Sequence, residues 1–240
     1  MSTNKVQLLY NICNEIFCHK QLPTFQQLNC LKNHLDEIKA IDVGIEELEE
    51  AECSIISPRG LIYAKGVSEI TYIHIHECDF FSIGIFCLPE GGELPLHDHP
   101  GMTVMSKLLY GSVHVKAYDW IKMQISSSTD RTFGLGKKVV DKVWSAPSEA
   151  RALFPASGGN IHSFRAKSGC AILDVLSPPY SQHLGRPSTY FSDFPLPTLP
   201  DCAMLEEIKQ PEDLYVVGAP YLGSSIVTKG DETYTYHQYF

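Results

Sequence analysis

From about residue 55 onward, the chain is a succession of short runs of β-branched and aromatic residues, separated by glycine, proline, serine and aspartate. Runs of this length and spacing are typical of an all-β barrel or sandwich, because each run can supply one strand and each break one turn. We expect strands at residues 70–77, 80–88, 103–110, 112–120, 151–154, 161–167 and 170–176, with further strand at residues 214–217 and 234–240 of the tail. Residues 177–200 are rich in proline, serine and aromatics, which predicts an ordered irregular loop.

The N-terminal part has helical rather than strand periodicity. Apolar residues recur at helical spacing in residues 6–17, which predicts a first helix. Thr24 and Gln27 have the spacing of a capping box at the start of a second helix, which continues to the stretch near Ile41. Residues 46–53 fit a short third helix.

Composition favours one domain with a sizeable core. Of the 240 residues, 44% are hydrophobic and 20% are charged, close to the average of soluble globular proteins. The sequence has no internal repeat and no low-complexity linker. We therefore expect residues 1–54 to form a helical region packed on a barrel of residues 55–240, the two making a single structural domain.

Charge, hydropathy and cysteine usage limit the class of partner. The formal net charge of -9 would repel the phosphate backbone of nucleic acid. Polar residues interrupt the N-terminal segment, and no other segment approaches the roughly 18 apolar residues of a membrane span. The eight cysteines form no CxxC pair, so we expect free thiols rather than disulfides or a cysteine zinc site. A soluble, intracellular protein that binds neither nucleic acid nor membrane is expected.

A pair of histidines two residues apart forms a candidate metal site. Residues 91–100 read GGELPLHDHP, and residues two apart in a strand project to the same face, so His97 and His99 can offer imidazole nitrogens to one metal. The third ligand should come from a distant strand. His162 is the best candidate, because two glycines in a turn precede it and a predicted strand follows it.

Other histidines are weaker candidates for metal ligands. His74 and His76 form a second His-x-His on a predicted strand, but they lack the glycine and proline turn. We interpret them as two residues on an exposed or edge-strand face. His114 lies in an alternating run, where it belongs to the polar face.

The surroundings of these histidines resemble the two motifs of the cupin proteins. The glycines before the histidine pair, the pair itself and Gly111 resemble the first motif, and Gly159-x-x-His162 resembles part of the second. The cupin pattern usually has a glutamate four or five positions after the second histidine, where this chain has Thr103 and Val104. A site of three neutral histidines without a carboxylate resembles that of the thiol dioxygenase branch of the cupins.

Longer segments narrow the resemblance. Residues 97–104, 106–112, 118–120 and 174–180 resemble the plant cysteine oxidases and their animal relative, cysteamine dioxygenase, and the similarity runs from the first helix to the tyrosine-rich tail. The resemblance implies a mainly β, cupin-type double-stranded β-helix, a jelly-roll barrel, with an N-terminal helical cap.

The resemblance also implies an activity. Enzymes of this family use Fe(II) and O2 to convert the thiol of an N-terminal cysteine to cysteine sulfinic acid, which marks the protein for the N-degron pathway. In plants the substrates include ethylene-response transcription factors, so the activity serves hypoxia and oxygen sensing. A monomer in the cytoplasm and nucleus is expected. Three histidines suit this chemistry, because they leave up to three positions on the iron open and favour an anionic thiolate.

Two further residues are candidates for a catalytic role. Asp174 is a carboxylate in an otherwise apolar predicted strand, where it must find a partner or cost several kcal/mol. We interpret it as an inward-facing residue that bonds a ligand or the substrate amine; the alternative is a surface carboxylate at a strand end. Tyr180 follows two prolines, which can place its hydroxyl near bound substrate or oxygen, and the alternative is simple aromatic packing.

One departure from the family concerns a crosslink. Relatives carry Cys-x-Tyr in the loop after Pro-Pro-Tyr, which in the animal enzyme can become a thioether, whereas this chain has Ser188 and Tyr190 there. A Cys–Tyr cofactor is not expected. Cys170 stays a possible thiol near the site, although a buried structural cysteine is the simpler interpretation.

Two alternative functions remain open from the sequence. The same iron centre could oxidise a free small thiol, cysteine or cysteamine, if the mouth of the site admits no chain. The barrel could also be a non-catalytic metal-binding cupin, against which the three histidines and an inward Asp174 argue.

Overall fold

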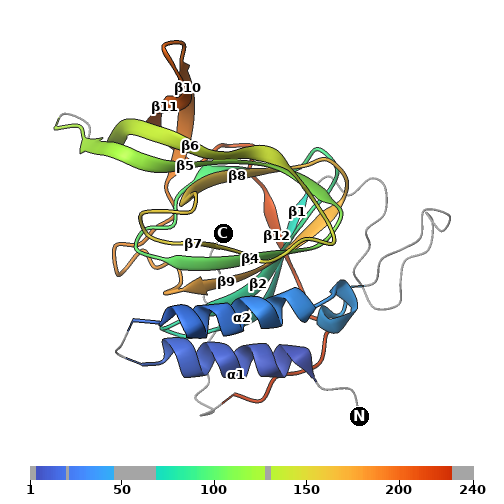
Figure 1. The fold of residues 1–240 in the computed structure, drawn as a ribbon. Helices are drawn as coiled ribbons and strands as arrows, with labels where there is room; N and C mark the ends of the chain where they lie inside the picture. Colours follow the sequence, from blue (N-terminus) through green and yellow to red (C-terminus); the bar gives the residue numbers. More distant parts are fainter. Residues whose placement is uncertain (1–3, 20–21, 46–68, 128–130, 229–240) are drawn as a thin grey trace.

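A computed structural model describes residues 4–19, 22–45, 69–127 and 131–228 of the chain (Figure 1). Within these ranges the protein is mainly β with helices at the N-terminus, as predicted. The helices are α1 (Lys5–Phe17), α2 (Phe25–Glu37) and the 3-10 helix η1 (Ala40–Val43). The strands are β1 (Ile70–Glu77), β2 (Ser82–Leu88), β3 (Glu93–His97), β4 (Thr103–Tyr110), β5 (Ser112–Ile125), β6 (Thr132–Ser145), β7 (Arg151–Leu153), β8 (Ile161–Ala166), β9 (Cys170–Ser177), β10 (Tyr190–Leu196), β11 (Leu199–Ile208) and β12 (Val216–Ala219).

The strands form two facing sets. One has the order β12-β1-β2-β9-β4-β7, and the other has the order β10-β11-β6-β5-β8-β3. In Figure 1 the layer of β5, β6 and β8 lies above the layer of β4, β9 and β2, and both helices lie beneath the lower layer. This is the expected jelly-roll barrel with a helical cap. None of the described helices is long and apolar enough to cross a membrane.

The helical cap is fixed by its N-caps and by burial of one face. Asn4 caps α1 by accepting a hydrogen bond from the backbone N–H of Gln7, at 3.0 Å, and Thr24 and Gln27 form the predicted capping box of α2. The apolar faces of the helices pack on the lower sheet, where Leu9, Leu35 and Phe81 are fully buried. Each such side chain stabilises the contact by roughly 1.5–3 kcal/mol, so the helices are part of the core.

Alternation along β9 decides which residues face the barrel interior. Ala171, Leu173 and Val175 pack in the core shared with the helices, whereas Cys170 and Ile172 pack among the residues inside the barrel. Asp174 has the same parity as Ile172, so its side chain points into the barrel, away from the helices. The sheet register places Asp174 beside Ser106 of β4.

Several strands follow the prediction closely, and others do not. β1 and β4 have the expected bounds, and β5 continues to Ile125 rather than ending at residue 120. The prediction of an irregular loop over residues 177–200 is wrong for its second half, which contains β10 and the start of β11. β6 was not expected either. The glycines and lysines of β6 have low intrinsic β-propensity. The segment is nevertheless a strand, because it pairs with β5 and β11.

Three expectations lie outside the described residues. They are the third helix at residues 46–53, the strand at residues 234–240 and the boundary between the helical region and the barrel at residues 54 and 55. The expected strand at residues 214–217 corresponds to β12, which pairs in parallel with β1.

Candidate metal centre

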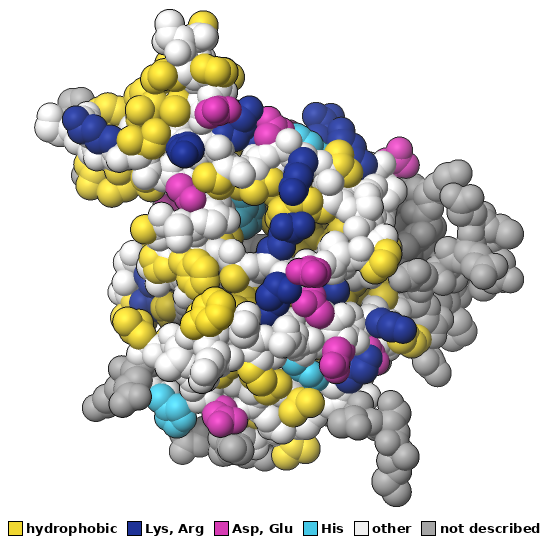
Figure 2. All heavy atoms as spheres, in the orientation of Figure 1, with side chains coloured by type: hydrophobic (Ala, Val, Ile, Leu, Met, Phe, Trp, Pro, Cys, Tyr) yellow, Lys and Arg dark blue, Asp and Glu magenta, His cyan; other side chains and the backbone are white. Residues whose placement is uncertain are grey.

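The three predicted histidines converge inside the barrel. His97 is the last residue of β3, His99 lies in the turn that follows, and His162 is the second residue of β8, directly opposite His97 in the register. One ring nitrogen of each lies within 4.8 Å of the others. The ring centroids are 4.7 to 5.0 Å apart. In Figure 2, a histidine side chain is visible in a recess between the two layers of strands, beside lysine or arginine side chains.

Each ring is oriented by a backbone carbonyl. The Nδ1 atom of His97 lies 2.8 Å from the carbonyl oxygen of Pro95, that of His99 lies 3.0 Å from the oxygen of Asn160, and that of His162 lies 3.3 Å from the oxygen of Gly159. A carbonyl can only accept, so the proton of each neutral ring must be on Nδ1. The lone pairs on the three Nε2 atoms are therefore free to coordinate one cation.

Burial keeps the three rings neutral. His99 and His162 are buried, and desolvation lowers the pKa of all three imidazoles. The neighbouring His97 adds to this effect and brings the pKa of His99 to about 3. Neutral imidazole is the form that binds a metal, so the site needs no deprotonation near neutral pH. The donor set fits a divalent transition metal that accepts nitrogen ligands.

Asn160 holds the backbone of His99 and Asp119 holds the turn before His162, and sequence reasoning did not identify either. The side chain of Asn160 accepts a hydrogen bond from the backbone N–H of His99 at 3.0 Å and donates to the carbonyl of the same residue at 2.9 Å. The carboxylate of Asp119 accepts from the backbone N–H groups of Gly158, Gly159 and Asn160 at 2.8 to 3.0 Å. The available signal was the position of Asn160, between the paired glycines and His162.

The glycines before His162 are required by the backbone. Gly158 and Gly159 have φ of +87° and +85°, which L-residues with side chains rarely adopt. A Cβ on Gly159 would lie 2.6 Å from the Cβ of Ala117 in the neighbouring strand. The turn therefore delivers His162 only with glycine at this position.

Asp174 faces the same interior from the opposite sheet. It is 7% exposed, its carboxylate is hydrogen-bonded to the side chain of Ser106, and its Oδ1 atom is buried without a hydrogen-bond partner among the described residues. Burial raises the pKa of Asp174 to about 7. A carboxyl group that titrates near neutrality inside a barrel can hold or release a proton, or pair with a cation that enters the site.

Tyr180 lies against the histidines, but its hydroxyl is engaged. Its ring centroid is 5.5 Å from that of His99, and its hydroxyl donates to the carbonyl of Asp98 at 2.7 Å. Ser188 is hydrogen-bonded to both Tyr180 and Tyr190. The hydroxyl of Ser188 thus lies between two tyrosines. Ser188 stands where the relatives have the cysteine of the crosslink.

The remaining candidates have structural contacts. The ring of His76 packs against Tyr10 of α1 at 4.8 Å and against Phe81 at 5.1 Å, while His74 is half-buried beside Tyr72. The two histidines are half-buried rather than exposed, and β12 pairs with β1 only as far as Ile73, so both lie beyond the β12 pairing. His114 pairs with Asp141 at 2.9 Å.

Cys170 is buried in the barrel core. Burial, together with the neighbouring Cys87, raises its thiol pKa to about 12. At such a pKa the thiol stays protonated near neutral pH, so it is no ready nucleophile. This supports the interpretation as a structural cysteine.

The chain is similar to known proteins over most of its length. The PCO_ADO family model matches residues 34–226. The chain is 41% identical to plant cysteine oxidase 1 of Arabidopsis thaliana, over 92% of this chain and 80% of that protein. It is 30% identical to 2-aminoethanethiol dioxygenase of Homo sapiens, over 84% of this chain and 82% of that protein. Among solved structures, an RmlC-like cupin protein from Desulfovibrio desulfuricans aligns with a TM-score of 0.31 and 16% identity, over 56% of this chain and 98% of that one.

Proposed function

We propose, because the chain belongs to the PCO_ADO family of thiol dioxygenases, that it is an iron enzyme that oxidises the N-terminal cysteine of proteins or peptides. The observation that carries the proposal is the set of three neutral histidines that bring one ring nitrogen each within 4.8 Å of the others, with each Nδ1 atom facing a backbone carbonyl. The reaction adds both atoms of O2 to the thiol and gives the sulfinic acid, an oxidation of the sulfur by four electrons.

His97, His99 and His162 would hold the Fe(II). Three neutral donors without a carboxylate leave the charge of the cation uncompensated, which favours binding of an anionic thiolate. When bound, the iron would supply a site for the thiolate and the activation of O2.

Asp174 and Tyr180 would act on the substrate side of the cluster. The Oδ1 atom of Asp174 has no hydrogen-bond partner among the described residues, and the side chain faces the interior. A protonated N-terminal amine in this interior would donate a charge-assisted hydrogen bond to that oxygen. Tyr180 presents its ring to His99 while its hydroxyl fixes Asp98, so we assign it the positioning of the turn between His97 and His99.

The cellular role proposed here follows the family. The substrates would be proteins with an N-terminal cysteine, such as ethylene-response transcription factors, whose oxidation feeds the N-degron pathway in oxygen sensing. Support comes from the 41% identity to plant cysteine oxidase 1. A monomer that works in the cytoplasm and nucleus is part of the same proposal.

A second candidate function is oxidation of a free small thiol. One relative, 30% identical, is named 2-aminoethanethiol dioxygenase, and 2-aminoethanethiol is cysteamine. The iron centre would be the same. The two candidates differ in the part of the substrate that lies beyond the thiol and amine.

Mass spectrometry separates these candidates. The iron-loaded protein is incubated in air with a peptide that has an N-terminal cysteine, with cysteine and with cysteamine. We expect a gain of about 32 Da, two oxygen atoms, on the peptide. Oxidation of the small thiols alone would shift the function to sulfur metabolism, and no oxidation despite bound Fe(II) would indicate a binding cupin.

A further inference from the structure

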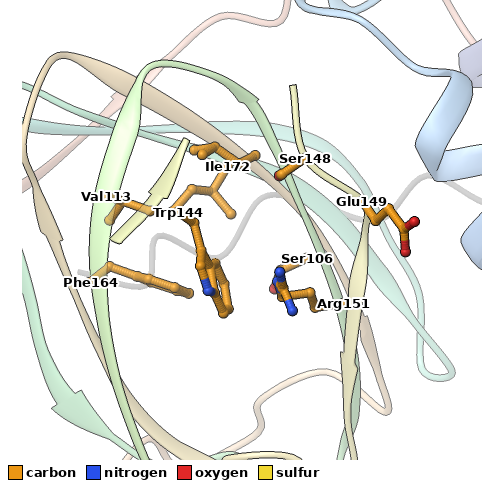
Figure 3. Close-up of a pocket in the computed structure, with 9 residues that line it drawn as sticks. Ser106, Val113, Trp144, Ser148, Glu149, Arg151, Phe164 and Ile172 are labelled. Carbon is orange, nitrogen blue, oxygen red and sulfur yellow. The ribbon is translucent and has the colours of Figure 1, made fainter. Parts of the chain in front are cut away.

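A pocket opens between the two sheets (Figure 3). Its volume is about 230 Å³, including open solvent at its mouth. Most of this volume is open solvent and space between the lining side chains, so the enclosed part has room for about one water molecule, enough for a single carbonyl oxygen. Buried apolar side chains such as Phe164 and Ile172 form part of the lining, and the exposed Arg151 and Glu149 belong to it as well.

Arg151 is a cation that has no anionic partner in the described part of the chain. Its guanidinium carbon lies 4.4 Å from the ring centre of Trp144, and within the described residues no carboxylate lies within ion-pair distance of it. The nearby Glu149 pairs instead with Lys32 of α2, at 3.1 Å. A guanidinium over an aromatic ring keeps its N–H groups free at the edge of the plane, where they can donate to oxygen acceptors.

A second hydrogen-bond donor lines the pocket. The Nε1 atom of Trp144 is buried and has no hydrogen-bond partner within the described residues. A buried unpaired N–H group costs free energy, which a bound acceptor would recover. Figure 3 shows Trp144 and Arg151 as neighbours in the lining of the pocket, with Ser106 beside Arg151.

Ring contacts connect the pocket to the metal centre. The centroid of Trp144 lies 6.2 Å from that of Phe164, and Phe164 lies 4.6 Å from His162. On the other sheet, the pocket residue Ser106 is hydrogen-bonded to Asp174. One wall of the pocket thus leads to a histidine of the cluster, and the other leads to the carboxylate assigned to the substrate amine.

The pocket residues before Arg151 are held in place by β4 and by the helical cap. The Nζ of Lys107 donates to the carbonyl of Ser148, and Asp36 of α2 accepts a hydrogen bond from the backbone N–H of Ala150. Both contacts fix the segment that leads into Arg151. A site held this rigidly loses little conformational freedom on binding.

We propose that this pocket binds the peptide backbone that follows the reacting cysteine, with Arg151 and the Trp144 N–H donating to its main-chain carbonyl oxygens. The inference rests on the proposed function and deepens it. An extended chain covers about 3.3–3.6 Å per residue, so roughly four or five residues span the ring contacts between His162 and Arg151. Cysteamine has no carbonyl oxygen and free cysteine is too short to reach Arg151, so the pocket selects peptides over both.

Steady-state kinetics of Arg151→Gln test the proposal. The substrates are an amidated pentapeptide with N-terminal cysteine followed by four alanines, which offers only main-chain acceptors, and cysteamine. The matched control is Arg165→Gln, since Arg165 is exposed on β8 and, within the described residues, its one ion-pair contact is with Glu93 at 4.0 Å. A second variant, Trp144→Phe, keeps an aromatic ring and removes the N–H.

We expect Arg151→Gln to raise KM for the pentapeptide about tenfold, because hydrogen bonds to a charged donor are lost, and to leave kcat and the oxidation of cysteamine within about twofold of wild type. Trp144→Phe should raise the same KM about threefold to tenfold, and Arg165→Gln should have no effect. An unchanged KM for the pentapeptide in Arg151→Gln overturns the proposal. An equal loss of kcat/KM for the pentapeptide and for cysteamine overturns it as well.

Binding measured without turnover separates the pocket from the chemistry. Wild type and Arg151→Gln are titrated calorimetrically with the same pentapeptide carrying N-terminal serine. We expect binding about tenfold weaker in the variant. If wild type oxidises no thiol, the proposed function fails, but the titration still tests whether the pocket binds peptides. Equal affinity of wild type and Arg151→Gln for the serine peptide, or no binding by wild type, would show that the pocket is not a peptide site.

Discussion

The side chain of Asn160 forms hydrogen bonds with both polar groups of the His99 backbone. The amide oxygen of Asn160 accepts from the His99 N–H at 3.0 Å, and the amide nitrogen of Asn160 donates to the His99 carbonyl at 2.9 Å. The carbonyl of Asn160 accepts in turn from Nδ1 of the same histidine, at 3.0 Å. One residue therefore sets both the backbone and the ring of a proposed metal ligand.

Replacing Asn160 with Ala should weaken metal binding about 10- to 100-fold, as loss of an outer partner of a ligand generally does. It should also destabilise the protein by about 2–4 kcal/mol, because buried groups of His99 and Phe154 lose their partners. Metal titration and chemical denaturation measure the two effects. Asn11→Ala on the exposed face of α1 is the control. Wild-type metal affinity in Asn160→Ala would show that the hydrogen bonds of Asn160 to His99 are not needed for metal binding.

His162→Ala should lower both the iron content and the turnover. With one of three donors removed, two imidazoles are left to hold the cation. Elemental analysis after loading, together with oxygen uptake, checks this. His114→Ala removes a surface histidine paired with Asp141 and should change neither quantity. Unchanged iron occupancy in His162→Ala would remove that residue from the ligand set.

Asp174→Asn should keep the iron and slow the oxidation of an N-terminal-cysteine peptide by about tenfold or more. The side chain is buried and faces the barrel interior, so the amide preserves the shape but withdraws the negative charge offered to the substrate amine. Oxygen uptake normalised to bound iron measures the effect. Full activity in this variant contradicts the assigned role.

The pKa of Asp174 also predicts how stability depends on pH in the metal-free protein. Below about pH 4 the carboxyl is protonated in both folded and unfolded chains. Between about pH 4 and pH 7 the unfolded chain has lost the proton while the folded protein keeps it, since burial raises the folded pKa to about 7. Raising the pH through this window therefore destabilises the fold, by on the order of 4 kcal/mol at most.

Denaturation at several pH values, compared between wild type and Asp174→Asn, isolates this contribution. The difference in unfolding free energy should change in favour of the variant as the pH rises from about 4 to 7 and stay constant above it. Parallel curves for the two proteins would mean that Asp174 ionises in the folded state at an ordinary pKa.

Tyr180→Phe should retain the iron and lose about 1 kcal/mol of stability, because the carbonyl of Asp98 loses its donor. We expect turnover to fall several-fold, since Asp98 lies between the two ligands His97 and His99. Tyr215→Phe, at an exposed position, is the matched control. Wild-type turnover would reduce Tyr180 to a packing residue.

The parts of the site that sequence could predict are those whose geometry is local. His97 and His99 are two apart at a strand end, and His162 follows a glycine turn, so their convergence needs only strand periodicity and one pairing. Asn160 and Asp119 act through contacts that depend on how β5, β8 and the turn after β3 meet, and polar residues in turns give no local sign of such partners.

The same distinction applies to the fold. The apolar, β-branched runs of β1 and β4 are visible in the chain itself. β6 and β10 carry lysines, glycines, serine and proline, and they are strands because β5 and β11 supply their hydrogen-bond partners. Tertiary pairing of this kind cannot be inferred from local propensity.

The carbonyl partners of the three imidazoles also bear on when the proposed metal would be taken up. Rotational entropy of the rings is lost when the chain folds, so binding of a metal would require no further ordering of these side chains. Under the proposed function, folding and metal loading would then be separate events, and a chain that folds without metal would already present its three ring nitrogens to a metal that arrives later.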